Sequence, residues 1–225
     1  MKPVSLPVAV LMTFVGGTLD AYTFITHGVF ATAQTGNVVL LLVGIVDGSD
    51  AFKYVWPILA FTVAVMVVQP VKHIASPRRA HTAAALVLAF EILILLGVGF
   101  VPASSASEWI AIPLSALAGL QLGLFRSVRN ASFASIATTG NLMRFAEAGY
   151  EALVGRNRTA LRSFIVCASI VIAFGAGALT GAVLTHLFGS AAIWFSALAQ
   201  GAVLVLYAAQ RPAFRPSEVG TRLPR

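Results

Sequence analysis

Two copies of a Thr-Gly-Asn triplet are the residues of this chain best suited to bind a polar molecule. The first follows a glutamine, as Gln34, Thr35, Gly36 and Asn37, and the second comprises Thr139, Gly140 and Asn141. Threonine and asparagine are helix-capping residue types that also offer hydrogen-bond partners to a solute, and glycine allows a sharp entry into a helix. A helix starting there presents free N–H groups and its positive dipole end, which suits an anion. The alternative is that each triplet only caps a helix.

Two carboxylates are predicted to lie inside apolar spans. An ionised carboxylate there costs about 2.5–3.5 kcal/mol on insertion scales, so each needs a partner or water. Asp20 is either a proton or cation site near His27, or a hydrogen-bonded structural group with Thr18, Thr23 or a distant arginine as its partner. Glu91 has no basic residue within a helical turn. It must therefore bind a proton, reach another helix or face a cavity.

Gln121 lies within an apolar stretch and is a candidate for lining a polar cavity, so it joins Asp20 and the two triplets as a predicted solute-binding residue. The histidines lack metal-ligand spacing, and the single cysteine, Cys167, offers no disulfide within one chain. Clustered acids or histidines, which a metal-dependent enzyme acting on lipids would need, do not appear in the sequence. We therefore expect no metal, no cofactor and no enzymatic activity.

The elements that must position these residues are membrane helices. Hydrophobic residues make up 58% of the 225 residues and charged residues only 10%, and the mean hydropathy is +0.89. Soluble domains contain roughly 45–50% apolar and about 25% charged residues. The net charge of +7 does not indicate a nucleic-acid partner, because the basic residues gather in short loops between apolar runs. The expected partners are the lipid bilayer and a small solute.

The apolar stretches predict an all-α polytopic membrane protein with about six transmembrane helices and two broken half-helices. The chain reads as one transmembrane domain over residues 1–210, with two halves at about 7–101 and 109–209. The broken segments are expected at Gly28–Val46 and Arg126–Val154. Residues 211–225 are rich in proline and arginine and are predicted to form a disordered tail.

Basic residues orient these helices, because cytoplasmic loops are enriched in lysine and arginine. They mark as cytoplasmic the loop after Lys72, the loop around Arg156 and the tail after Arg211. The second broken segment then enters and leaves on the cytoplasmic side, with Arg126 and Arg129 at its start. If the first broken segment is also re-entrant, the N-terminus is cytoplasmic and the halves form an inverted repeat of three plus three spans. The rival interpretation makes Gly28–Val46 a full span.

The chain resembles a known family in the order of its motifs. These are Gly17-Thr-Leu-Asp20-Ala-Tyr22, Gly28-x-Phe30, the two triplets, and Gly119-Leu-Gln121 between them. They are similar to the YoaK family of bacterial multi-pass membrane proteins, defined by domain of unknown function 1275. The resemblance implies about six spans in a bacterial inner membrane and supplies no substrate. Leu122 departs from the pattern, which has an asparagine after the glutamine.

The sequence features suggest three functions. A transporter or channel for a small polar or anionic solute would bind it between the two breaks, with Asp20 providing coupling or selectivity. A structural or regulatory subunit of a membrane complex is the alternative, and an exposed small-residue face such as Gly177-x-x-x-Gly181 would be its sign. A lipid-modifying enzyme lacks the required clusters. A homo-oligomer is compatible with any of these.

Overall fold

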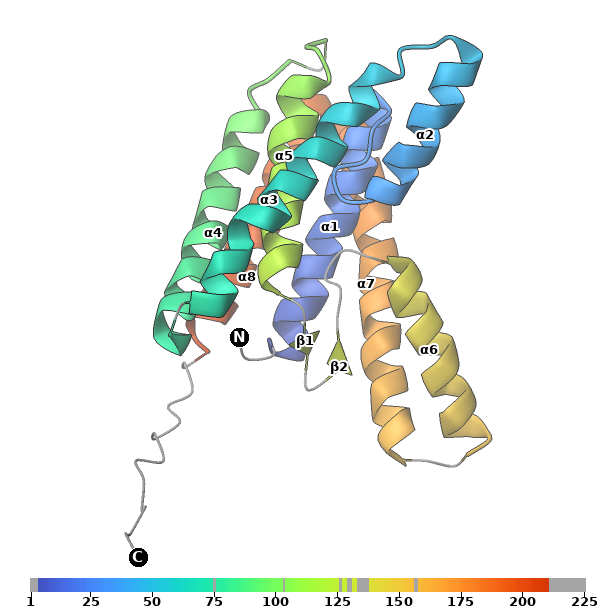
Figure 1. Cartoon of the computed structure of the whole chain (residues 1–225), viewed down its shortest axis with the longest axis vertical. Coiled ribbons are helices and arrows are strands. Elements are labelled where there is room, and N and C mark those ends of the chain that lie inside the picture. Colours follow the sequence, from blue (N-terminus) through green and yellow to red (C-terminus); the bar gives the residue numbers. More distant parts are fainter. Residues whose placement is uncertain are drawn as a thin grey trace, which may run out of the picture.

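The structure is a computed structural model of the chain and describes residues 4–74, 76–102, 104–125, 127–128, 131–132, 138–155 and 158–210. It is a bundle of long helices (Figure 1). The α-helices are α1 (Leu6–His27), α2 (Gln34–Asp47), α3 (Val55–Ile74), α4 (Pro77–Val98), α5 (Glu108–Leu124), α6 (Thr138–Leu153), α7 (Arg158–Phe188) and α8 (Ile193–Ala208). Two 3-10 turns, Phe52–Tyr54 and Gly189–Ala192, precede α3 and α8. The predicted tail, Arg126 and Arg129 lie outside the described residues.

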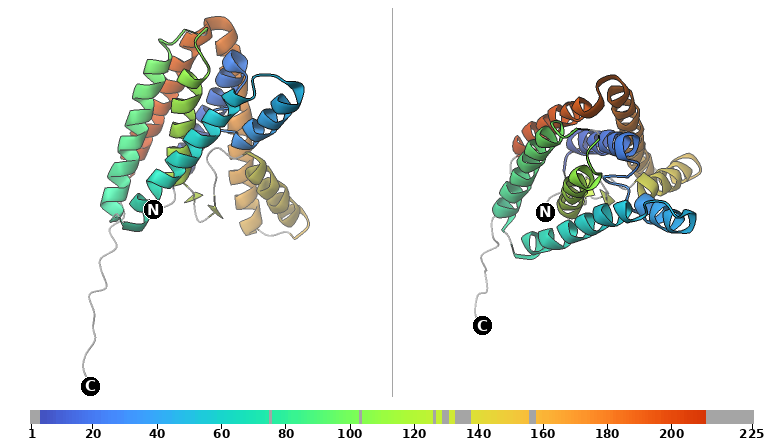
Figure 2. Two further views of the ribbon diagram at one scale, coloured as in Figure 1. Left: turned by 45° about the horizontal axis from the view of Figure 1, so that its top comes forward. Right: turned by 90° about the horizontal axis from the view of Figure 1, so that it is seen from above.

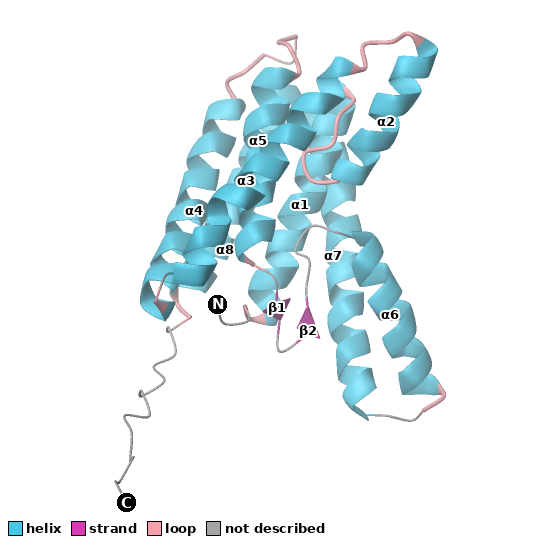
Figure 3. Ribbon diagram, in the orientation of Figure 1, coloured by secondary structure: helices cyan, strands magenta, loops and turns pink. Residues whose placement is uncertain are grey.

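Among the described residues, a small strand pair and an isolated β-bridge at Val4 depart from the all-α prediction. β1 (Ser127–Val128) pairs antiparallel with β2 (Ala131–Ser132) between α5 and α6 (Figure 3, magenta). Sequence patterning could not reveal it, because two residues are too few for an alternating pattern. All other regular elements among the described residues are helices.

Four segments of the described chain are long and apolar enough to cross a membrane. They are Leu6–His27, Phe52–Pro70, Arg78–Val98 and the stretch Thr159–Ala208, which contains both α7 and α8. The apolar helix α5 is shorter, at 17 residues. The outer surface supports a lipid environment, because four large apolar side chains of α3 are 51–65% exposed: Leu59, Val63, Met66 and Val67. The apolar helices therefore indicate a membrane-embedded protein.

Glycines bring pairs of helices into close contact at the centre of the bundle, where α1 and α5 lie (Figure 2). α1 packs on α7, and α5 packs on α3. A Cβ atom added to Gly17 of α1 would overlap the carbonyl oxygen of Phe174, and one added to Gly119 of α5 would overlap that of Phe61. Gly177 and Gly181 of α7 meet the α1 backbone at Phe14 and Thr18 in the same way. These small residues serve helix packing, and the Gly177–Gly181 face is used inside the chain.

Both triplets begin short helices, as predicted. α2 has 14 residues and α6 has 16, so they span about 21 and about 24 Å, less than the roughly 30 Å of a bilayer core. Each starts near the middle of the bundle's height, and they run towards opposite ends (Figure 1). The predicted capping role is wrong for α2, because its N-cap is Ala33 and no side chain caps it. Thr35 and Asn37 instead lie within its first turn. The sharp turn falls at Gly28, with φ of 68°, rather than at Gly36.

Candidate polar site within the helix bundle

The loop between α1 and α2 places irregular backbone beside apolar helices, and Asn37 satisfies part of it. Such backbone is tolerated in a membrane only where its N–H and C=O groups find partners. Asn37 is fully buried; its Oδ1 accepts from the Phe30 N–H (2.9 Å), and its Nδ2 donates to the Phe30 carbonyl (2.7 Å) and to Gln34 Oε1 (2.9 Å). The amide of Asn37 is thus committed to the fold of the loop.

Asp20 holds the same loop from α1. Its Oδ1 accepts from the backbone N–H of Thr32 (2.7 Å) and its Oδ2 from the Thr32 hydroxyl (2.5 Å). Thr23 adds a further bond, accepting from the Ala31 N–H (3.1 Å). The expected partners of the Asp20 side chain were Thr18, Thr23 or a distant arginine, but Thr18 instead bonds Ser196 of α8 (2.9 Å) and the Thr23 hydroxyl bonds backbone groups of Leu19 and Ala31. The actual partner, Thr32, lies 12 residues away in a loop that sequence patterning does not position.

The remaining residues of the first triplet have different surroundings. Gly36 faces the ring of Phe30, and a Cβ added there would lie 2.8 Å from Phe30 Cδ2. That ring stacks on Phe24 with centroids 4.8 Å apart. Gln34 donates to the Ala31 carbonyl (2.9 Å), and Thr35 is exposed. The N–H groups of Gln34 and Gly36 already bond carbonyls of the loop, so the start of α2 offers fewer free donors than expected.

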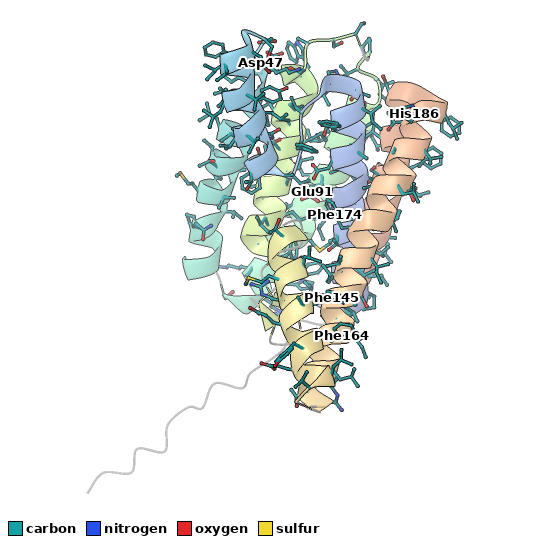
Figure 4. The ribbon with its side chains drawn as sticks, turned by 90° about the vertical axis from the view of Figure 1, so that its right-hand side faces the viewer. Asp47, Glu91, Phe145, Phe164, Phe174 and His186 are labelled. Carbon is teal, nitrogen blue, oxygen red and sulfur yellow. The ribbon has the colours of Figure 1, made fainter. Side chains whose placement is uncertain are left out.

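Glu91 forms a second polar group with two glutamines from other helices. Glu91 of α4, Gln121 of α5 and Gln200 of α8 are 3%, 5% and 1% exposed. Both amide nitrogens donate to Glu91 Oε2, that of Gln121 at 3.4 Å. Glu91 Oε1 and Gln200 Oε1 are buried and have no protein partner among the described residues. Figure 4 shows Glu91 inside the bundle, near the middle of its height.

A small enclosed cavity joins this group to the first break. Thr32, which Asp20 holds, lines it together with Glu91, Gln121 and Gln200. The remaining lining is apolar or glycine: Val15, Gly16, Leu19, Leu95, Leu117 and Ala118. Its volume is about 10 Å³, room for roughly one water molecule. The first break therefore borders this small cavity, called the chamber below, which has a mostly apolar wall with four polar residues in it.

The second triplet lies apart from the Glu91 group. Asn141 is 4% exposed, Thr139 is exposed, and a Cβ added to Gly140 would meet nothing within 4 Å. α6 packs on α7, where Phe145 and Phe164 stack with centroids 4.7 Å apart (Figure 4). The starts of α2 and α6 lie near one another in both views (Figures 1 and 2). Thr35 and Thr139 are thus the exposed polar side chains of the two breaks.

The predicted site residues fall into three groups: the loop clasp of Asp20, Gln34 and Asn37, the chamber with Gln121 and Glu91, and the second half-helix start. Sequence reasoning missed Gln200 and Thr32. The signal for Gln200 was available, because it is the one amide within the apolar run Ile193–Ala208. Among the described residues, no three His, Cys, Asp or Glu side chains gather where they could hold a metal ion.

Comparison with known proteins identifies the family alone. No curated protein and no solved structure matches the chain. A family model described as "Protein of unknown function (DUF1275)" matches residues 8–206, which is nearly the whole chain and includes all the predicted site residues. The family expected from the order of the motifs is thereby confirmed, and the chain belongs to the DUF1275 family.

Proposed function

We propose that this protein is a membrane transporter or channel for a small polar or anionic solute, without enzymatic activity. One observation carries the proposal: the break loop, through Thr32, shares the wall of the chamber with the polar side chains of Glu91, Gln121 and Gln200. Buried ionisable and amide groups in the middle of a membrane bundle are expensive, and they usually mark a pathway for a polar species. A bundle needed only for anchoring has no use for them.

An inverted repeat would give this chamber two-sided access. In our proposal α1, α3, α4 and α5, α7, α8 are the six spans, and α2 and α6 are the re-entrant helices. The matched contacts support it, because α1 packs on α7 through Gly17 at Phe174 and α5 packs on α3 through Gly119 at Phe61. The opposite directions of α2 and α6 support it too (Figure 1). One repeat would rock against the other in alternating access.

The membrane and its orientation follow from the same proposal. The start of α1 and the end of α8 lie at one end of the bundle (Figure 1). The positive-inside rule makes that end cytoplasmic, and the family resemblance points to a bacterial inner membrane. In this orientation α2 ends outside and α6 ends inside. The partners are the lipid bilayer and the solute, and a homo-oligomer remains compatible.

Labelling of single cysteines tests the orientation. Ser49, just after α2, and Val154, just after α6, are both exposed. A Ser49→Cys variant should react with a membrane-impermeant maleimide in intact cells, and a Val154→Cys variant only after permeabilisation. The native Cys167 is buried and serves as the unlabelled background. Equal labelling of both variants in intact cells would contradict the inverted repeat.

The solute is expected at the facing starts of α2 and α6. The positive dipole ends favour an anion or a polar head group there. Thr35 and Thr139 are its expected contacts, because both are exposed whereas Asn37 is occupied by the loop. The alternative function, a structural subunit, loses its expected docking face, because Gly177 and Gly181 are packed against α1.

A thermal-shift screen against organic acids, inorganic anions, sugars and amino acids tests the proposal. A ligand at 100 times its dissociation constant should stabilise the folded protein by about 2.7 kcal/mol. The stabilisation should disappear in the Thr35→Val/Thr139→Val double variant and persist in Thr62→Val. Thr62 is an exposed threonine of α3 whose hydroxyl bonds only its own helix, at Ile58 (2.7 Å). Stabilisation that survives in the double variant would place the solute elsewhere.

A further inference from the structure

We propose that Glu91 is a proton-binding site in the interior of the bundle, and that the chamber beside it serves this proton rather than an anion. That the proton takes part in solute movement rests on the function proposed above. The binding of the proton itself does not. The argument uses the hydrogen bonds of Glu91, the size of the chamber and the charges on the helices packed around α4.

One carboxyl oxygen of Glu91 receives no hydrogen bond from the described residues. Its Oε2 accepts from the side-chain amides of Gln121 and Gln200, whereas its Oε1 is buried and has no partner in the part of the chain that the structure describes. Gln200 Oε1 is a second buried acceptor in the same condition. A buried acceptor that receives no hydrogen bond is unfavourable. A proton on Glu91 Oε1 removes the negative charge and converts one of these acceptors into a donor, which a water molecule or an acceptor oxygen in the chamber can then use.

Other occupants fit the chamber less well. An anion bound in place of the proton would meet the ionised carboxylate of Glu91 and the carbonyl oxygen of Gln200, which has no protein partner among the described residues, and both would repel it. A calcium or magnesium ion takes about six or more oxygen ligands, which a cavity of about 10 Å³ with two open acceptors does not supply. A proton on Glu91 Oε1 needs no further volume, and a cavity of about 10 Å³ has room for roughly one water molecule beside it.

Among the described residues, the partners of the Glu91 carboxylate are amides, and the charged residues of the neighbouring helices lie mainly towards the helix ends. α8 contributes no charged residue, and its titratable Tyr207 stacks on His81 near the start of α4. α5 contributes only Glu108, its first residue. α1 contributes Asp20, which reaches the chamber wall through Thr32, and His27 at its last residue. The remaining charges are those of Lys72 and His73 near the end of α3, and of Arg78 and Arg79 in the first turn of α4.

This arrangement allows the proton to leave and return. When the chamber opens to water, the O–H bond of the Glu91 carboxyl group breaks and the proton passes to a water molecule. The resulting carboxylate keeps the two amide donors at Oε2, which stabilise its charge while the chamber is wet. When the chamber closes again, loss of water favours the neutral form and the proton rebinds. Glu91 therefore links protonation to the opening of the chamber.

Infrared difference spectroscopy of the full chain in lipid nanodiscs tests the proposal, with the proton as the probe. We expect a carbonyl stretching band of a protonated carboxyl group that decreases as the buffer is made alkaline. The band should be lost in Glu91→Gln and kept in Asp20→Asn. Gln200→Met, which removes one amide neighbour, should shift the band without abolishing it. Circular dichroism and thermal unfolding establish that each variant is folded.

Two results would overturn the inference. A band that Glu91→Gln retains and Asp20→Asn loses would assign the proton to Asp20. A folded wild-type protein with no such band at any pH would mean that Glu91 stays ionised. Either result leaves the solute screen with the Thr35 and Thr139 variants unaffected, so failure of the proton site is distinguishable from failure of the proposed function.

Discussion

Replacement of Asn37 by alanine should destabilise the fold rather than only weaken solute binding. The variant removes both partners of the Phe30 backbone, the acceptor for its N–H and the donor to its carbonyl. Each backbone group left unpaired away from water costs about 1–3 kcal/mol. The expected loss in free energy of unfolding is therefore about 2–6 kcal/mol, a large fraction of the typical stability of about 5–15 kcal/mol.

Denaturant titration in detergent micelles, followed by circular dichroism, measures this loss. Gln69→Ala is the matched control, because the Gln69 amide donates to the carbonyl of Val65 (2.8 Å) one turn earlier in α3. That carbonyl belongs to the helix, so the control should change stability by no more than about 0.5–1 kcal/mol. If Asn37→Ala unfolds with the same free energy as Gln69→Ala, the amide does not hold the loop. Its role would then have to lie in solute binding.

Two further substitutions test the other contacts that shape the bundle. Thr32→Val should lower the free energy of unfolding by about 1.5–3 kcal/mol in the same titration, because Asp20 loses a charge-assisted hydrogen bond. The control Thr62→Val should be nearly neutral, because its hydroxyl bonds only its own helix. Equal effects of the two variants would mean that the bond between Asp20 and Thr32 does not hold the loop. Gly177→Ala should cost about 1–3 kcal/mol or more, because its Cβ would overlap the Phe14 carbonyl oxygen. The control is Gly97→Ala, whose added Cβ meets nothing within 4 Å, and it should be neutral or stabilising by up to about 1 kcal/mol. A similar loss of unfolding free energy in Gly177→Ala and Gly97→Ala would argue against close packing at Gly177.

The two broken segments show which features a local sequence pattern can predict and which it cannot. The position of both half-helix starts was predictable, since a polar, glycine-containing triplet interrupts an apolar run in each half. The role of Asn37 was not, because its hydrogen bonds depend on a loop that folds back over seven residues to reach Phe30. A capping residue and a loop-holding residue have the same side chain. Only the path of the backbone distinguishes them.

By itself, the sequence determined the membrane class, the approximate helix bounds, the doubled break and the need of Asp20 and Glu91 for partners, because each depends on composition or spacing within one element. Only the tertiary structure determined which residues are the partners of Asp20 and Glu91. Gln200 reaches Glu91 across 109 residues, and Thr32 connects Asp20 to the same chamber. The burial energy of a carboxylate requires that a donor be present. The crossing of α4, α5 and α8 determines which donor can reach it.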